Sequence, residues 1–289
     1  MLPTQHIALY GSRRQDGYEK DIMEFIRLLH DFGVAVTLHD KLADALSDAF
    51  PLPEWVAVSR RLPADVDVAI SFGGDGTFLR TARWVGRSGR PVLGVNTGHL
   101  GFLADNAIGH LPEIARAVAS GEVAVERRFL LKVEYEGMPR EFWPYALNEV
   151  AFLKEETSSM INVDMNIDGN FLADYRADGL IVSTPTGSTA YALSAGGPIV
   201  EPTLSCMVLA PIAPHTLTLR PLVVGGDSLL EATVTSRSDT FRLSLDGRST
   251  VLPCGSRNHI SRADYQLSVI RMLSDNFPST LRRKLLWGN

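Results

Sequence analysis

A glycine-rich turn that carries one carboxylate is the part of this sequence best suited to chemistry. The run Phe72-Gly73-Gly74-Asp75-Gly76-Thr77 follows a strand-like segment at 66–72 and precedes a helix-like segment at 78–85. Glycines let a ligand approach the backbone, and free N–H groups at the positive end of a helix attract an anion. A carboxylate repels phosphate unless a cation or a reacting hydroxyl lies between them. The turn therefore indicates phosphoryl transfer, with Asp75 serving a metal or an attacking hydroxyl.

A second segment concentrates hydroxyl groups where a strand is expected to end. Six hydroxyl side chains fall between Ser183 and Tyr191, directly after the apolar run at 180–182. Hydroxyls and free N–H groups gathered at one turn suit the base and sugar of a nucleotide. Capping of a helix that begins near Ser188 explains one or two of the hydroxyls, but it does not explain their density. We therefore favour a binding role for this segment.

Two further segments have ordinary structural explanations beside functional ones. Asn148-Glu149 joins an amide to a carboxylate, and such a pair can grip the two vicinal hydroxyls of a ribose. A solvated strand edge would show the same residues. The segment Asn96-Thr97-Gly98-His99-Leu100-Gly101-Phe102-Leu103 exposes polar atoms beside an aromatic ring, or it simply ends a strand in a tight loop. Taken alone, neither segment identifies a site.

Single charged residues near these segments are equally open to two interpretations. Arg176 stands two residues before Asp178, close to the hydroxyl-rich segment, and could bind a phosphate through two hydrogen bonds. A surface arginine is as reasonable an interpretation. The pair Asp246-Gly247 between alternating segments is a hairpin signal that needs no ligand.

The first third of the chain alternates between strands and helices. Strands are expected at 6–11, 34–38, 66–72 and 91–96, and helices at 22–29, 78–85 and 112–120. Short apolar strands separated by helices predict a parallel sheet covered on both faces, in a Rossmann-like α/β domain. Ligands bind such sheets at the carboxyl ends of the strands, which is where the glycine turn falls.

From about Glu122 onward, alternation with a period of two replaces helical spacing. The clearest example is the apolar set at 161, 163, 165 and 167, which precedes the turn Asp168-Gly169. Further strands are expected at 130–135, 216–219, 229–235, 241–245 and 265–270. We therefore expect an α/β domain at 1–121 and an all-β sandwich at 122–270. Residues 271–289, helical over 275–287, are expected to pack back on the first domain.

Composition excludes several classes of protein. The 289 residues include 28 Lys+Arg and 33 Asp+Glu, for a net charge of −5 and no basic block, so no nucleic-acid partner is expected. Apolar runs stay shorter than the roughly 20 residues of a membrane span, and the first residues show no signal pattern. We therefore expect a cytoplasmic protein with no membrane partner. The two cysteines and seven histidines lack metal-binding spacing, so the ligands of any metal stay unknown.

Taken together, the segments resemble the NAD kinase family. The matching runs keep the family order and lie at 73–77, 96–102, 148–149, 178–191, 194–199 and 246–247. The glycine run alone is shared with phosphofructokinases and with diacylglycerol and sphingosine kinases, whereas the run at 178–191 separates NAD kinases from them. The resemblance implies transfer of the γ-phosphoryl group of ATP to the 2′-hydroxyl of the adenosine ribose of NAD. It also implies a divalent cation, usually Mg²⁺, and a homo-oligomer, either tetramer or dimer.

The resemblance further implies roles for individual residues. Asp75 would be the base that takes the hydroxyl proton, and Asn148 with Glu149 would hold the adenosine portion. Phe102 would pack against the dinucleotide. The remaining residues expected at the nucleotide site are Gly73, Gly74, Gly76, Thr77, Asn96, Arg176, Asp178, Thr186, Thr189, Ala190, Tyr191, Ser194 and Asp246.

Two other functions fit parts of the sequence. A lipid kinase of the diacylglycerol or sphingosine type shares the glycine run, but it predicts a membrane-binding face, and no exposed basic amphipathic helix is evident. A non-catalytic dinucleotide-binding regulator would keep the binding loops and lose the base. The presence of Asp75 argues against that second alternative.

Overall fold

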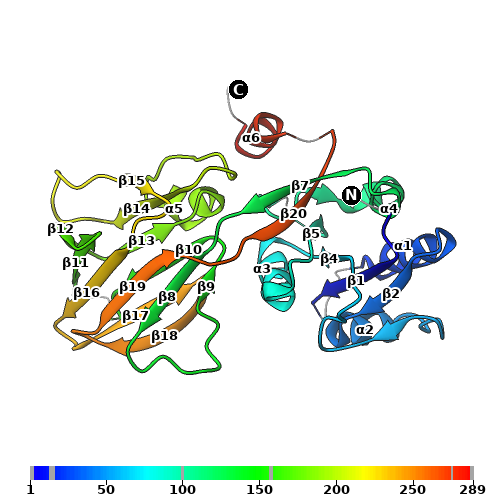
Figure 1. Cartoon of the computed structure of the whole chain (residues 1–289), viewed down its shortest axis with the longest axis horizontal. Helices are drawn as coiled ribbons and strands as arrows, with labels where there is room; N and C mark the ends of the chain where they lie inside the picture. The colour runs from blue at the N-terminus through cyan, green and yellow to red at the C-terminus, as the bar shows by residue number, and fades with distance from the viewer. Residues whose placement is uncertain (1–2, 13–16, 99–100, 156–158, 275, 287–289) are drawn as a thin grey trace. The chain divides into compact units, whose positions relative to one another are not determined.

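The computed structural model describes residues 3–12, 17–98, 101–155, 159–274 and 276–286, and the chain divides into two compact units (Figure 1). Unit 1 comprises the chain up to Arg127 together with the chain from Leu267 onward. Unit 2 is the segment Arg128–Gln266. The borders between the two units fall after residues 127 and 266, whereas the sequence predicted domain borders after residues 121 and 270.

Unit 1 is built on a largely parallel sheet with the strand order β3-β2-β1-β4-β5-β20-β7, and β6 pairs with β5. Neighbouring strands from β3 to β20 run parallel. The strands are β1 His6–Gly11, β2 Ala35–Leu38, β3 Ala57–Val58, β4 Val68–Phe72, β5 Val92–Asn96, β6 Asn106–Ala107, β7 Val123–Arg128 and β20 Leu267–Met272. The strands β1, β4 and β5 are fully buried or nearly so, as strands covered on both faces require.

The helices α1 to α4 of unit 1 bury one face each, because their apolar residues recur at helical spacing. Helix α1 buries Ile22, Phe25, Ile26 and Leu29 in a core shared with α2, α4 and the sheet. The helices are α1 Glu19–Asp31, α2 Asp40–Ser47, α3 Asp75–Val85, α4 Leu111–Ser120 and α6 Phe277–Leu285, with short turns η1 Gly86–Ser88 and η2 Ile108–His110. None of the described helices combines the length and apolar character that crossing a membrane requires.

Unit 2 consists of two antiparallel sheets. Their strand orders are β15-β14-β13-β10-β17-β18 and β12-β11-β16-β19-β8-β9. The strands are β8 Leu131–Tyr135, β9 Tyr145–Ala146, β10 Glu149–Leu153, β11 Ile161–Ile167, β12 Asn170–Ala177, β13 Gly179–Ser183, β14 Cys206–Ile212, β15 Leu222–Gly225, β16 Leu230–Ser236, β17 Thr240–Leu245, β18 Arg248–Pro253 and β19 Arg257–Arg262. Two short helical segments follow β13, η3 Thr186–Thr189 and α5 Tyr191–Ser194.

Both sheets of unit 2 contribute apolar side chains to one core, so the unit is a β-sandwich. Val163 and Met165 of β11 share this core with Phe152 of β10 and Leu243 of β17. The hairpin turn between β11 and β12 has positive φ at both central residues, 50° at Asp168 and 80° at Gly169. The structure thereby confirms the expected pairing of an α/β domain with an all-β sandwich.

One expected strand belongs to a different sheet from the one predicted. The strand expected at 265–270 is β20, but it pairs with β5 in the parallel sheet of unit 1 instead of joining the sandwich. Figure 1 shows this orange-red strand beside the strands of unit 1, which come from much earlier in the chain. Apolar alternation indicates that a strand buries one face, and it does not specify which sheet receives that strand.

Another expected strand, at 216–219, is wrong, because this segment lies between β14 and β15 in an irregular conformation. Leu217 is 88% exposed instead of buried. The guanidinium of Arg220 donates to the carbonyls of Leu217 and Leu219, and Thr216 Oγ1 accepts from the Thr218 N–H. Local hydrogen bonds of this kind compete with a sheet ladder, and the alternating Thr-Leu pattern does not reveal them.

Candidate active site

The glycine turn ends β4 and begins α3, with Gly74 as the N-cap and Asp75 as the first helical residue. Gly73 has a φ of 142°, and a Cβ at its position would lie 2.5 Å from Thr77 Oγ1. This turn therefore requires glycine at 73 for both conformation and space. The N–H groups of the first helical turn, which includes Gly76 and Thr77, lie at the carboxyl edge of the sheet, where a phosphate would meet the positive end of the helix.

The carboxylate of Asp75 accepts hydrogen bonds from three consecutive backbone amides. Oδ1 accepts from Leu103 at 3.0 Å and from Ala104 at 2.9 Å, and Oδ2 accepts from Phe102 at 2.9 Å. Such bonds fix the orientation of the carboxylate, which is half-buried. A carboxylate offers about four acceptor positions, so Oδ2 keeps capacity for one more proton donor. The segments 72–77 and 96–103, far apart in the sequence, are thus joined by hydrogen bonds.

Two residues of the second segment allow this arrangement. Gly101 packs directly on the carboxylate, and a Cβ at its position would lie 1.9 Å from Asp75 Oδ1. Asn96 uses both ends of its amide within the loop, since Oδ1 accepts from the Gly98 N–H and Nδ2 donates to the carbonyl of Ala104. Asn96 is therefore placed to shape the loop. His99 and Leu100 of this segment lie outside the described residues.

Arg80 is a candidate that sequence reasoning missed. It stands one helical turn after Gly76 on α3, and its Nη2 donates to Thr77 Oγ1 at 2.9 Å. Its guanidinium also interacts with the hydroxyl of Tyr10, at the carboxyl end of β1. An arginine beside a glycine-rich turn can bind a phosphate with two hydrogen bonds. The signal that could have found it is helical spacing, because Arg80 stands three residues after Thr77 and four after Gly76, on the same helix face.

In unit 2, Asp246 repeats the pattern seen at Asp75. Its carboxylate accepts from the backbone amides of Leu147 at 2.7 Å, Asn148 at 2.8 Å and Glu149 at 3.1 Å. Asp246 lies in a turn with a φ of 49°, a conformation that aspartate tolerates better than most residues. The pair Asn148-Glu149 is therefore held at the start of β10 by a residue almost a hundred positions later. The hairpin expected at Asp246-Gly247 is confirmed, since this turn joins β17 to β18, and the Asp246 carboxylate also holds the 147–149 backbone.

Glu149 has a perturbed carboxyl group. Burial, and secondarily the nearby carboxylate of Asp246, raise its pKa to about 7, while a hydrogen bond from the Tyr191 N–H opposes the shift. Within the described part of the chain, its Oε2 is buried and has no hydrogen-bond partner. A buried polar atom of this kind is costly unless a ligand satisfies it, so Glu149 is a candidate binding residue.

The hydroxyl-rich segment folds against the Asn148-Glu149 pair. Thr184 Oγ1 donates to the carbonyl of Leu147, and the Thr184 N–H donates to that of Asn148. Gly187 passes so close that a Cβ would lie 2.1 Å from the Asn148 carbonyl oxygen. Several hydroxyls are thus used to build the loop, whereas Thr186 Oγ1 is buried and lacks a partner among the described residues.

The remaining expected site residues differ in their surroundings. Tyr191 and Ser194 are exposed, and Thr189 and Ala190 are half-buried beside them on η3 and α5. Asp178 forms an ion pair with Lys154 at 2.7 Å. Arg176 is 70% exposed and lies 3.4 Å from Asp174, a geometry typical of a solvated surface ion pair. The structure therefore brings 148–149, 184–191 and 246 together around shared contacts, and it gives Arg176 and Asp178 partners of their own.

Family models match most of the chain. The ATP-NAD kinase N-terminal domain matches residues 15–123, and the ATP-NAD kinase C-terminal domain matches residues 147–272. Two solved structures share the fold. The crystal structure of yeast NADH kinase complexed with NADH has a TM-score of 0.88 at 25% identity, covering 99% of this chain and 89% of that one. An NAD kinase from Archaeoglobus fulgidus in complex with ATP has a TM-score of 0.73 at 29% identity, covering 96% and 99%.

Bacterial relatives are closer in sequence. A protein named NAD kinase from Porphyromonas gingivalis strain W83 is 44% identical over 283 residues, which is 98% of each chain. One from Bacteroides fragilis is 46% identical over 224 residues, 78% of this chain and 77% of the relative. These matches confirm the expected family and set aside the lipid kinases that share only the glycine run. The chain is a member of the NAD kinase family.

Proposed function

We propose that this member of the NAD kinase family transfers the γ-phosphoryl group of ATP to the 2′-hydroxyl of the adenosine ribose of NAD, giving NADP, and that Asp75 accepts the hydroxyl proton. The observation that carries the proposal is the carboxylate of Asp75, which three backbone amides orient while Oδ2 keeps room for one more donor. A ribose hydroxyl is a poor nucleophile at neutral pH. A positioned carboxylate accelerates its reaction by roughly 10²–10⁴-fold.

Phosphates would be bound by the turn around Asp75. The N–H groups of Gly74 and Gly76 lie at the start of α3, where the Thr77 N–H donates to the Gly74 carbonyl, and Arg80 adds a guanidinium that lies against Thr77. Arg80 would supply the positive charge that the lysine of the glycine-rich loop provides in P-loop NTPases. We assign Gly73 to the conformation of the turn.

The adenosine portion of NAD would be held by unit 2. Glu149 accepts from ribose hydroxyls, Asn148 completes the grip, and the selection of the 2′-hydroxyl over the 3′-hydroxyl follows from placement, because the two groups are chemically alike. Thr186 offers a buried hydroxyl, and Thr189, Ala190, Tyr191 and Ser194 line the base and sugar. Phe102 packs against the dinucleotide. Asp246 acts by holding the 147–149 backbone.

A divalent cation would enter with the nucleotide. No group of three or more His, Cys, Asp or Glu side chains suited to a metal occurs in the described parts of the chain. Mg²⁺ commonly binds through substrate phosphates, several waters and one or two carboxylates, so the residues present are compatible with it. When bound, it neutralises charge on the triphosphate.

We also propose a cytoplasmic homo-oligomer, either a tetramer or a dimer. Unit 2 supports the oligomer by exposing large apolar side chains, with Leu217 at 88% and Phe171 at 65% exposure. Light scattering after size-exclusion chromatography measures the mass directly. A monomer at micromolar concentration would contradict this part of the proposal.

The activity itself is tested by incubating the protein with ATP, Mg²⁺ and NAD⁺ and reading NADP⁺ with a dehydrogenase specific for that product. We expect NADP⁺ to accumulate with time and enzyme concentration. Failure to form NADP⁺ at any ATP concentration would contradict the proposal. Running the same assay with NADH and with polyphosphate defines the accepted substrates.

A further inference from the structure

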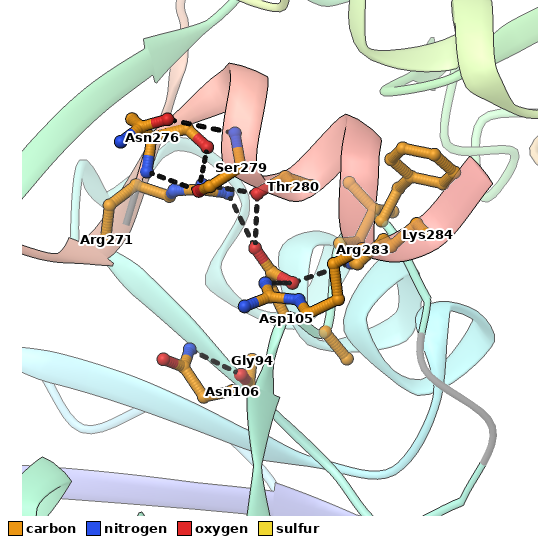
Figure 2. A network of polar contacts seen from close by, with 12 residues as sticks. Gly94, Asp105, Asn106, Arg271, Asn276, Ser279, Thr280, Arg283 and Lys284 are labelled. Atoms are coloured by element: carbon orange, nitrogen blue, oxygen red, sulfur yellow. Dashed lines mark hydrogen bonds and ion pairs between the residues drawn. The ribbon is translucent and has the colours of Figure 1, made fainter. Parts of the chain in front are cut away.

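Asp105 lies directly after the 102–104 amides that hold Asp75, and it is surrounded by cations of β20 and α6. Its carboxylate lies 3.2 Å from Arg271 Nη1, 2.8 Å from Lys284 Nζ and 2.5 Å from Arg283 Nη2, and it accepts a hydrogen bond from Thr280 Oγ1 at 3.1 Å. Figure 2 shows the carboxylate beneath α6, facing the labelled side chains of the helix. The Asp105 side chain is only 5% exposed, so water screens these contacts little.

Helix α6 depends on this contact for its position. It spans nine residues and begins with a capping box, in which the Asn276 side chain accepts from the Ser279 N–H and the Ser279 hydroxyl accepts from the Asn276 N–H. Caps define where a helix starts, but a helix this short is marginal without tertiary packing. Asp105 supplies a buried attachment point (Figure 2).

Lys284 differs from the two arginines in what else it touches. Its Nζ lies 5.1 Å from the centroid of the Phe102 ring as well as 2.8 Å from Asp105. Its side chain is 2% exposed, against 42% for Arg283. Burial lowers the pKa of Lys284, whereas the carboxylates of Asp105 and Asp75 oppose that shift. Lys284 therefore contacts the first and last residues of the segment 102–105, whose amides at 102–104 bind Asp75.

Neutralising Asp105 does not require Lys284. Arg271 and Arg283 already pair with that carboxylate, and Thr280 donates to it. Burying a further ammonium group carries a desolvation penalty. The contact with Phe102 gives this third buried cation a role. A cation over an aromatic face fixes the ring and the backbone attached to it.

We propose that Lys284 is a positioning residue for phosphoryl transfer, holding Phe102 and Asp105 so that the 102–104 amides keep the Asp75 carboxylate in its reactive orientation. This inference rests on the proposed function, since it requires Asp75 to be the proton acceptor. Displacement of a reacting group by about 1 Å can lower a rate by about 10²-fold. Lys284 acts through the loop and touches no substrate.

The test compares Lys284→Met with Arg282→Met. Methionine keeps the length and apolar stem of Lys284 and removes its charge, while Arg282 is an exposed cation on the same helix. We expect Lys284→Met to lower kcat at least about tenfold, with KM for ATP within about threefold of wild type. We expect Arg282→Met to resemble wild type. If Lys284→Met does not fold, Lys284→Gln, which keeps a donor toward Asp105, replaces it.

A double-variant comparison separates positioning from general destabilisation. In an Asp75→Asn background, Lys284→Met should cause little further loss of kcat, because its effect passes through the carboxylate that is already absent. Hydrogen exchange gives a readout independent of activity. The N–H groups of Phe102, Leu103 and Ala104 should exchange at least about tenfold faster in Lys284→Met than in Arg282→Met.

The outcomes distinguish the inference from the proposed function. Wild-type turnover in Asp75→Asn would overturn the proposed function. A slow Asp75→Asn enzyme combined with wild-type kcat in Lys284→Met, or with losses that multiply in the double variant, would overturn the inference alone. Unchanged exchange at 102–104 would overturn it as well.

Discussion

Gly101 and the carboxylate of Asp75 are in such close contact that a Cβ on Gly101 would lie 1.9 Å from Oδ1 and 2.3 Å from Cγ. Real Cβ atoms do not approach so closely, so Gly101→Ala must displace either the carboxylate or the loop. We expect kcat to fall by about 10²-fold or more. The measurement is steady-state NADP⁺ formation together with the melting temperature.

Gly98→Ala is the matched control for that variant. Gly98 is in the same loop, and a Cβ at its position meets nothing within 4 Å. Its kcat should stay within about twofold of wild type. Equal losses of kcat in the two variants would show that the loop tolerates no side chain at either position. The loss in Gly101→Ala could then not be attributed to the contact with Asp75.

Asp75→Asn tests the proton acceptor directly. Asparagine has one acceptor oxygen in place of two, so it cannot accept from all three of Phe102, Leu103 and Ala104 as the carboxylate does. We expect kcat to fall by about two to four orders of magnitude while NAD⁺ still binds. Turnover assays and calorimetric titration with NAD⁺ measure the two effects. Unchanged turnover would remove Asp75 from the mechanism.

The raised pKa of Glu149, about 7, predicts a pH dependence of dinucleotide use. In the role proposed for Glu149, the ionised carboxylate accepts from ribose hydroxyls, so kcat/KM for NAD⁺ should rise as pH increases through about 7. Glu149→Gln should weaken NAD⁺ binding or misplace the ribose, and it should flatten this part of the profile. A profile with the same inflection in wild type and variant would assign the titration to another group.

The same carboxyl group predicts an effect on stability. Because its pKa is raised from 4.5 to about 7 in the folded protein, the folded state binds more protons than the unfolded state between these values. The free energy of unfolding contributed by Glu149 therefore falls as pH rises through this window. Chemical denaturation at pH 5 and pH 8 should show Glu149→Gln gaining stability relative to wild type at the higher pH.

Asp246→Asn should lower the pKa of Glu149, although the two residues are far apart in the sequence. The substitution removes a negative charge that helps to raise the pKa of Glu149, so the inflection in kcat/KM for NAD⁺ should move to lower pH. Asparagine tolerates the positive φ at this position, so the turn itself should survive. It loses part of the acceptor capacity toward Leu147–Glu149, so KM for NAD⁺ should also rise. An unmoved inflection would contradict the coupling.

Local features of the fold were predictable from the sequence because they depend on neighbouring residues. The strands at β1 and β11 match the expected 6–11 and 161–167, and the glycine turn joins β4 to α3 as expected. The helix starts at Asp75, earlier than the expected residue 78, because Gly74 serves as its N-cap. Glycine offers no side-chain cap, so the sequence lacks the usual start signal there.

Relationships over long distances in the chain were not predictable. Neither Asp75 nor Phe102 indicates that the amides of 102–104 close on the carboxylate, since backbone donors carry no sequence signature. The ion pair between Asp105 and Lys284 joins residues separated by more than half of the chain. In the sequence alone, each residue is interpreted as an ordinary surface charge. The role of Gly101 likewise appears only when the atom that would collide with its Cβ is known.

The return of β20 and α6 to the first unit imposes an order of events on biosynthesis. Asp75 leaves the ribosome early, but the partners that anchor the neighbouring Asp105, from Arg271 to Lys284, are translated only after the whole sandwich. A nascent chain interrupted before that point would lack β20 and so would have an unfinished parallel sheet. Assembly of the parallel sheet and of the Asp105 contacts therefore requires translation at least as far as Lys284.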